Sequence, residues 1–153
     1  MKTKKTKTSR QITPFLWFEG RAAEAAKFYA SIFPRAKILS VSPMSATLQL
    51  AGQKLILFNG GPHYKLTPAV SLFVHCQTQK EVDYYWARLT RGGEESRCGW
   101  LVDKFGLSWQ VVPDILFTLL SDEDPGKADR AMQAMLKMRK LDIQALKRAH
   151  AGR

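Results

Sequence analysis

Gln110 is a polar side chain in a stretch that otherwise suits burial, and its amide must find a partner there. The residues around it are predicted to form a strand with two distinct faces: Ser108, Gln110 and Val112 on one, and Leu107, Trp109 and Val111 on the other. Burying an amide without hydrogen-bonding partners costs free energy. We therefore expect Gln110 to contact a protein group, a water molecule or a ligand.

The histidines and cysteines lack neighbours of the kind that catalysis by these residues needs. His63 and His75 have no adjacent nucleophile or carboxylate motif, which favours a structural role for each. Cys76 and Cys98 lie 22 positions apart without a CxxC motif, which favours reduced structural thiols over a disulfide or a metal site. Cys98 has no local base, so we do not expect it to act as a nucleophile.

The net charge of +11 is concentrated at the two ends of the chain. Residues 1–10 carry five basic and no acidic residues, residues 126–153 carry eight basic and two acidic, and the remaining 115 carry eleven of each. A globular nucleic-acid-binding protein usually carries its basic patch on the folded domain. The distribution therefore favours a disordered, solubilising tail over residues 1–11 and argues against nucleic acid as a partner.

A chain of 153 residues can bury a core without help from a metal or a disulfide. No apolar run approaches the length of a membrane span, and the N-terminus lacks the apolar segment of a secretory signal. We therefore expect a cytoplasmic protein with one domain, or with two half-size modules that share a core.

The first half of the chain is predicted to contain a strand, a helix and three more strands. The strands are expected at residues 12–18, 37–41, 46–50 and 54–58, and the helix at residues 21–33. Pro14 fits only the start or the edge of a sheet. The Asn-Gly-Gly-Pro turn at residues 59–62 lacks the spacing and the following helix of a phosphate loop, and we interpret it as structural.

The second half repeats this order of elements. Strands are expected at residues 70–76, 94–98, 100–102 and 107–112, and a helix begins near Thr78, which can form a capping box with Glu81. Asp103 and Gly106 are typical of a tight turn before the last strand.

The two halves form an internal repeat, because their predicted helices begin 58 positions apart. The same offset aligns the leading strands residue by residue: Thr13 with Ser71, Phe15 with Phe73, and Trp17 with His75. Two βαβββ modules that each leave one sheet face uncovered can pair and enclose a concave surface. We therefore predict an α+β fold of paired βαβββ modules over residues 12–124.

Residues 125–153 are expected to form a helical extension. Asp124 before Pro125 marks the start of one helix, and Asp142 marks the start of a shorter one. The first helix carries an apolar stripe that should pack on the body of the protein: Ala128, Ala131, Met132, Met135 and Met138.

Several segments resemble the vicinal oxygen chelate superfamily of glyoxalases, dioxygenases and bleomycin-resistance proteins. They are ITPFLWFEG at 12–20, AAKFYASIFP at 25–34, LFNGGP at 57–62, EVDYYWARL at 81–89, CGWLVDKFGLSWQVVP at 98–113 and MQAMLKMRKLDI at 132–143. The sequence is most similar to the PhnB-like branch, whose members are often described as 3-demethylubiquinone-9 3-methyltransferase domains. The resemblance implies the glyoxalase/bleomycin-resistance fold and favours a homodimer.

In metal-using relatives, each of four strands supplies one ligand. By this resemblance, the four ligand positions correspond to Thr13, to Phe58 or Asn59, to Ser71 and to Gln110. Only Gln110 has a plausible ligand atom, and one amide oxygen cannot hold a divalent cation that needs four to six donors. We therefore expect no catalytic metal and no glyoxalase or dioxygenase chemistry.

The remaining side chains suit the binding of a small molecule. The concave surface is expected to be lined by aromatic and small polar groups: Thr13, Phe15, Trp17, Asn59, Ser71, Phe73, His75 and Gln110. Such a lining suits a planar, mostly apolar ligand, and the alternative is that the rings only fill a core. We predict a small-molecule-binding protein without a cofactor, whose reaction is unknown.

Two other functions remain as alternatives. One is the methyl transfer that the family description implies, although the chain lacks the glycine-rich turn and the spaced acidic residue that usually hold S-adenosylmethionine. The other is a structural or interaction module that uses the basic C-terminal helices.

Overall fold

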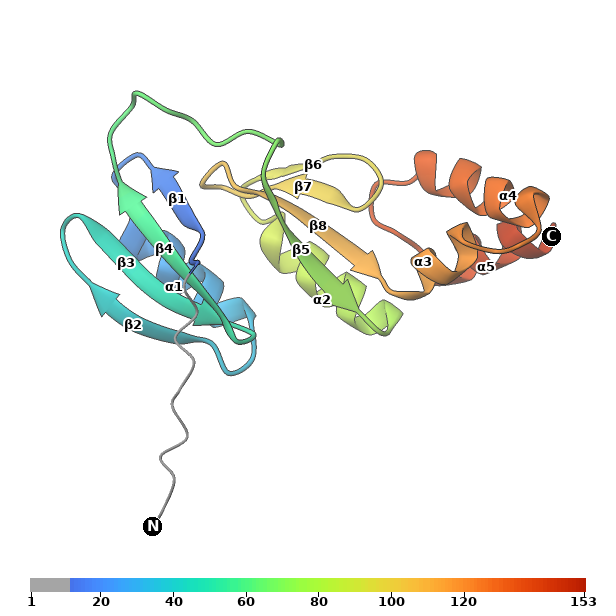
Figure 1. Cartoon of the computed structure of the whole chain (residues 1–153), viewed down its shortest axis with the longest axis horizontal. Coiled ribbons are helices and arrows are strands. Elements are labelled where there is room, and N and C mark those ends of the chain that lie inside the picture. The colour runs from blue at the N-terminus through green and yellow to red at the C-terminus, as the bar shows by residue number, and fades with distance from the viewer. Residues whose placement is uncertain (1–11) are drawn as a thin grey trace, which may run out of the picture. The chain divides into compact units, whose positions relative to one another are not determined.

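The computed structural model describes residues 12–153, so the basic tail expected at residues 1–11 lies outside the described residues. The chain divides into two compact units, of which the first ends at Tyr64 and the second begins at Lys65. Each unit holds one four-stranded sheet with a helix packed against it, as Figure 1 shows. This mixed α+β architecture agrees with the predicted fold class.

The first unit has the strand order β1-β4-β3-β2. Its elements are β1 (Phe15–Phe18), α1 (Ala22–Ile32), β2 (Lys37–Val41), β3 (Ser45–Leu50) and β4 (Gln53–Asn59). β1 runs parallel to β4, and β2, β3 and β4 form an antiparallel meander. One face of the sheet packs against α1, which buries Tyr29 and Ile32 together with alternate strand residues such as Leu48 and Leu57.

The leading strand is shorter than predicted, because it begins at Phe15 and not at residue 12. Pro14 has no N–H to donate to a ladder, although its carbonyl still accepts a hydrogen bond of 3.0 Å from Ile56 N. The side chain of Ile12 lies in solvent.

The second unit repeats the topology, with the strand order β5-β8-β7-β6. Its elements are β5 (Ser71–Cys76), α2 (Gln79–Leu89), β6 (Glu94–Glu95), β7 (Trp100–Val102) and β8 (Ser108–Pro113). β5 is parallel to β8, as β1 is to β4, which confirms the internal repeat. The predicted capping box of α2 is present: Glu81 N donates to Thr78 Oγ1, and Thr78 N donates to Glu81 Oε2.

The strand predicted at residues 94–98 is wrong beyond Glu95. Cys98 and Gly99 have φ angles of +57° and +83°, which take the chain out of the sheet. Their amides instead donate to the carbonyls of Met138 and Arg139, so the C-terminal segment pairs with this turn. Glycine is required at 99, since a Cβ there would lie 2.8 Å from Val111 O.

Three helices follow the second sheet, namely α3 (Ile115–Leu120), α4 (Pro125–Leu136) and α5 (Ile143–Ala151). The structure confirms the two predicted N-caps: Asp124 accepts from Gly126 N and Lys127 N, and Asp142 accepts from Ala145 N. α3 was not predicted. α4 also ends before Met138, which nevertheless packs on the core that the helices share.

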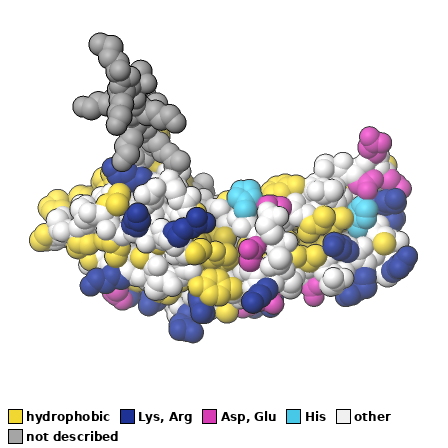
Figure 2. All heavy atoms as spheres, turned by 90° about the horizontal axis from the view of Figure 1, so that it is seen from below, with side chains coloured by type: hydrophobic (Ala, Val, Ile, Leu, Met, Phe, Trp, Pro, Cys, Tyr) yellow, Lys and Arg dark blue, Asp and Glu magenta, His cyan; other side chains and the backbone are white. Residues whose placement is uncertain are grey.

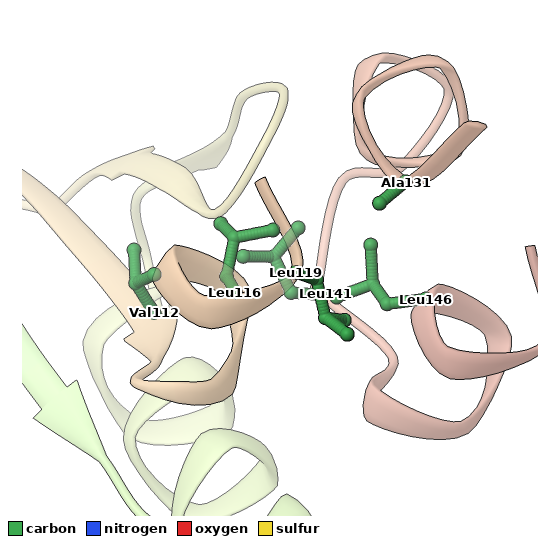
Figure 3. Packing of buried hydrophobic residues seen from close by; sticks show 6 residues of the cluster. All are labelled: Val112, Leu116, Leu119, Ala131, Leu141 and Leu146. Atoms are coloured by element: carbon green, nitrogen blue, oxygen red, sulfur yellow. The ribbon is translucent and has the colours of Figure 1, made fainter. Parts of the chain in front are cut away.

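This shared core, the C-terminal cluster, joins the helices to the second sheet. It consists of Val112 from β8, Leu116 and Leu119 from α3, Ala131 from α4, Leu141, and Leu146 from α5, whose side chains converge in Figure 3. The Gln79 amide of α2 adds polar links, because Nε2 donates to Leu141 O and Oε1 accepts from Ile143 N. The helices therefore pack on the body as predicted.

Within residues 12–153, none of the helices has the length and apolar character that crossing a membrane requires.

Replacing Leu146 with alanine should lower the free energy of unfolding by about 2–5 kcal/mol, because the truncation leaves a cavity in the C-terminal cluster. Urea unfolding followed by circular dichroism measures this difference. Leu136→Ala is a matched control: Leu136 is 48% exposed on α4, so its truncation should change the stability by less than about 0.5 kcal/mol.

Deleting residues 125–153 should destabilise or aggregate the protein for the same reason, since Val112, Leu116 and Leu119 lose their cover. A truncated protein with an unchanged melting temperature would contradict this account of the packing.

Candidate functional site

Aromatic side chains lie on the face of the first sheet that is opposite α1. Leu16 and Phe18 are buried toward the helix, so alternation places Phe15 and Trp17 on the opposite face. Phe58 of β4 joins them, with its ring centroid 5.2 Å from that of Phe15 and 5.2 Å from that of Trp17. Phe15 is 56% exposed, so this face carries an aromatic patch in contact with solvent, next to polar residues of β3 such as Ser45 and Thr47.

Trp17 is fixed in place by the turn that follows β4. Its Nε1 donates a hydrogen bond of 2.9 Å to Gly61 O, and its ring makes an edge contact with Tyr64 at 5.0 Å between centroids. A Cβ on Gly60 would lie 2.1 Å from the indole ring, so the ring can pack there only against glycine. The Asn-Gly-Gly-Pro turn therefore has the structural role predicted for it.

The structure gives Asn59 a role in holding the backbone. Its Oδ1 accepts a hydrogen bond of 2.8 Å from Ala22 N at the start of α1, and its Nδ2 donates to Pro43 O at 3.1 Å. Both ends of the amide are thus bound by main-chain atoms. Thr13 is half-buried and lies immediately before β1.

Strand register identifies the counterpart of Gln110 in the first unit. Gln110 pairs with Phe73 across β5 and β8, and Ile56 pairs in the same way with Phe15 across β1 and β4. The equivalent position is therefore Ile56. This corrects the sequence-based assignment of the second metal-ligand place to Phe58 or Asn59.

The face of the second sheet opposite α2 carries the other predicted site residues. Ser71, Phe73 and His75 alternate along β5, and Gln110 lies beside them on β8. Gln110 Nε2 donates a hydrogen bond of 3.0 Å to Ser71 Oγ, so the partner expected for this amide includes a protein group. Ser108, which pairs with Ser71, is buried, and its hydroxyl has no hydrogen-bonding partner among residues 12–153.

His75 lies next to a carboxylate, contrary to the interpretation of the sequence. Its Nδ1 is 2.8 Å from Asp114 Oδ1, and its ring centroid is 4.8 Å from that of Phe73. The parallel register pairs Cys76 with Pro113, and Asp114 N donates to Cys76 O at 2.8 Å. This pairing brings together residues 39 positions apart, so only a prediction of strand partners could have found the contact.

Two further residues surround this pair, and sequence reasoning missed both. Gln77 Nε2 donates to the second carboxylate oxygen of Asp114. The ring of Phe117, on α3, lies 5.9 Å from that of Phe73 and is 51% exposed. The second unit alone therefore brings an imidazole, a carboxylate and two exposed aromatic rings together.

A buried carboxylate positions β8, which carries Gln110. Asp103 Oδ1 accepts from Phe105 N at 2.8 Å and from Leu107 N at 3.1 Å, which confirms the predicted turn. Oδ2 accepts from the indole Nε1 of Trp109 at 2.8 Å. These three bonds fix both the turn and the face of β8 on which Trp109 lies.

The residues at the four ligand places offer few atoms that could bind a metal ion. No group of three or more His, Cys, Asp or Glu side chains suited to a metal ion occurs within the described part of the chain. Thr13, Ile56, Ser71 and Gln110 offer hydroxyl, alkyl and amide groups, and Gln110 directs its Nε2 at Ser71. This set of donors does not fit a divalent cation.

The two cysteines are free thiols in different surroundings. Burial raises the pKa of Cys76 to about 12, and the nearby carboxylates of Glu81 and Asp114 add to this rise. Cys76 is therefore a neutral core residue. Cys98 is half-buried in the turn that pairs with Met138.

Comparisons with known proteins agree with this topology. A family model described as 3-demethylubiquinone-9 3-methyltransferase matches residues 10–112. A PhnB protein from Bacillus cereus is 34% identical, with a TM-score of 0.64 over 68% of this chain and 99% of that chain. None of the curated proteins compared with the chain matches it.

Two other solved structures support the fold alone, since each is less than 25% identical. Protein PA1353 from Pseudomonas aeruginosa is 21% identical, with a TM-score of 0.57 over 69% of this chain and 98% of that chain. The fosfomycin resistance protein FosX from Listeria monocytogenes is 18% identical, with a TM-score of 0.51 over 66% of this chain and 86% of that chain.

The free energy of unfolding should fall with rising pH in a way that depends on Cys76. The unfolded chain releases this proton near the ordinary pKa of 9.0, whereas the folded state keeps it up to about 12. Between these values each pH unit costs about 1.4 kcal/mol of stability from this group. Urea unfolding at about pH 8 and about pH 10 should show a smaller loss for Cys76→Ala than for wild type.

Val74→Ala, at a buried position of the same strand that has no ionisable group, serves as the control and should keep the pH dependence of the wild type. Equal losses of stability in the Cys76→Ala variant and the wild type would show that the thiol ionises freely in the folded protein.

Proposed function

The chain belongs to the family described as 3-demethylubiquinone-9 3-methyltransferase, the PhnB-like branch of the vicinal oxygen chelate superfamily, and we propose that it binds a small, planar aromatic molecule. The ligand would lie against the open face of a sheet, opposite the helix of that unit. We propose that this binding needs no metal, because the ligand places carry hydroxyl, alkyl and amide groups.

The observation that carries the proposal is the exposure of aromatic rings on these faces. A sheet face in water normally carries polar side chains in alternation with the buried ones. Here Phe15 is 56% exposed and Phe73 is 37% exposed, and each has another ring beside it. Contiguous exposed apolar surface is typical of an interaction site, and aromatic rings stack well on planar ligands.

Polar groups among the rings would orient the ligand. We propose that each sheet contributes contacts from the predicted residues other than Asn59: Thr13, Phe15 and Trp17 on the first sheet, and Ser71, Phe73, His75 and Gln110 on the second. Asn59 would act indirectly, since its amide holds the start of α1. The free thiols of Cys76 and Cys98 fit the reducing cytoplasm that we propose as the compartment.

Phe73→Ala should weaken the binding of aromatic probes by about tenfold or more, because the ring supplies stacking surface. Quinones and aromatic acids can be screened by thermal shift and their affinities measured by quenching of tryptophan fluorescence. Tyr84→Ala is the matched control, because Tyr84 is 36% exposed but belongs to α2, which packs on the other face of the sheet. Equal losses in the two variants would mean that the aromatic face is not the binding surface.

The family description supports methyl transfer as the alternative function. Neither strand-to-helix connection is the glycine-rich turn that usually holds this methyl donor. The connection from β1 to α1, residues 19–21, contains one glycine, Gly20, and the connection from β5 to α2 consists of Gln77 and Thr78. S-adenosylmethionine belongs in the same thermal-shift screen. At a hundred times its Kd a ligand stabilises a protein by about 2.7 kcal/mol, so stabilisation by this compound would favour the methyltransferase.

We propose that the protein is a homodimer. All five residues of β2 are exposed, including Ile38, Leu39 and Val41, and β2 is an edge of its sheet. Long apolar edges without protection tend to pair with another chain. Native mass spectrometry should therefore show two chains of 17.3 kDa each, without a stoichiometric metal ion. A single chain at micromolar concentration would contradict the dimer, and a bound zinc, iron, nickel or manganese ion would contradict metal independence.

A further inference from the structure

We propose that His75, Asp114 and Gln77 form a proton-accepting site, at which His75 Nε2 binds the hydroxyl group of a phenolic ligand. This inference rests on the proposed function, because it assumes an aromatic ligand on the second sheet, and it specifies the chemical class of that ligand. All the residues involved lie in the second unit.

The contact with Asp114 determines which nitrogen of His75 carries the proton. A carboxylate can only accept, so Nδ1, at 2.8 Å from Asp114 Oδ1, must be the donor. In the neutral imidazole the other nitrogen, Nε2, then holds a lone pair. The His75 side chain is 66% exposed, so a ligand can reach this atom.

Asp114 is dedicated to this contact rather than to its own helix. Asp114 is the N-cap residue of α3. At the same position in α4 and α5, Asp124 and Asp142 cap their helices with their carboxylates. Within the described part of the chain, the Asp114 carboxylate makes no such bond to α3. Its two oxygens instead bind His75 and Gln77, and its amide is fixed to Cys76 O.

Stability does not account for this arrangement. The side chains of His75 and Asp114 are 66% and 36% exposed, and such a pair contributes roughly 0–1 kcal/mol. A second His–Asp pair within residues 12–153 is different: His150 Nε2 lies 2.8 Å from Asp122 Oδ2. Both of these side chains are more buried, and they join α5 to the segment before α4. Figure 2 shows histidine side chains (cyan) at the surface beside acidic ones (magenta).

Two aromatic rings border the imidazole and can hold a phenol. Phe73 lies 4.8 Å from the His75 ring and 5.9 Å from the Phe117 ring, and both phenylalanines are exposed. A phenol that packs on Phe73 can direct its hydroxyl to His75 Nε2. Ser71 and Gln110, further along the same face, would contact polar groups at the other end of the ligand.

The proton transfer involves no other reactant. The phenol O–H bond breaks, an N–H bond forms at His75 Nε2, and the electron pair stays on the phenolate oxygen. The resulting imidazolium keeps its Nδ1–H bonded to Asp114 Oδ1. The step reverses when the phenolate takes the proton back.

Nitrogen-15 NMR of the full-length protein tests the orientation without any ligand. Neutral His75 should carry its proton on Nδ1, whereas neutral His150, which bonds through Nε2, should carry it there and serves as an internal reference. Asp114→Ala should shift His75 toward the Nε2–H form that free imidazole side chains favour. A His75 that is already protonated at Nε2 in the wild type would overturn the proposal.

Binding of 4-nitrophenol and of its methyl ether, 4-nitroanisole, tests the recognition of the hydroxyl. Wild type should bind the phenol more tightly and increase the absorbance of its phenolate form. His75→Gln should weaken phenol binding by about tenfold and remove the absorbance change, and it should weaken binding of the ether by much less, because the ether has no proton to donate. Circular dichroism confirms that this exposed substitution leaves the fold intact.

Other outcomes separate the two proposals. If both compounds bind and His75→Gln changes neither, the aromatic binding function stands and the proton-accepting site is wrong. If the wild type binds neither these compounds nor the quinones and aromatic acids, the proposed function is wrong, and so is phenol recognition by His75.

Discussion

A four-stranded sheet with one helix can bury only one of its faces, and the rest of this structure depends on that constraint. α1 and α2 pack against alternate residues of the strands and bury them, among them Leu48, Leu57 and Val111. The opposite faces are therefore free to carry side chains that folding does not need. On them the sequence places exposed rings among the polar and charged groups that keep the sheet in solution. The proposed binding function follows from this division between the two faces.

Strand register then decides which chemistry the second sheet can present. A slip of one residue in β8 would send Gln110 to the helix side and Trp109 to the other. Asp103 opposes such a slip, because one buried carboxylate binds both the backbone of the turn and the Trp109 indole. The parallel pairing with β5 carries the same register to the end of β8, where it brings Asp114 beside His75.

Local patterns in the sequence predicted most helices and strands, but they could not predict which strands pair over long distances in the chain. The alternation over 107–112, the capping box at Thr78 and the cap at Asp142 depend on residues within a few positions, and each is present. The contact between His75 and Asp114 depends on which strands pair, as does the binding of Asn59 to α1. α3 has six residues, too few for a helical repeat to be read.

The C-terminal helices border the candidate site as well as forming part of the core. The family model ends at residue 112, so Asp114 and Phe117 belong to the segment beyond the match. Leu116 and Leu119 of α3 are buried in the C-terminal cluster, on the side of the helix away from the exposed Phe117. Because α4 and α5 complete that cluster, they hold α3 in place and with it the carboxylate and the ring that border His75. The same sheet without these helices would keep His75 and lose the groups that orient it.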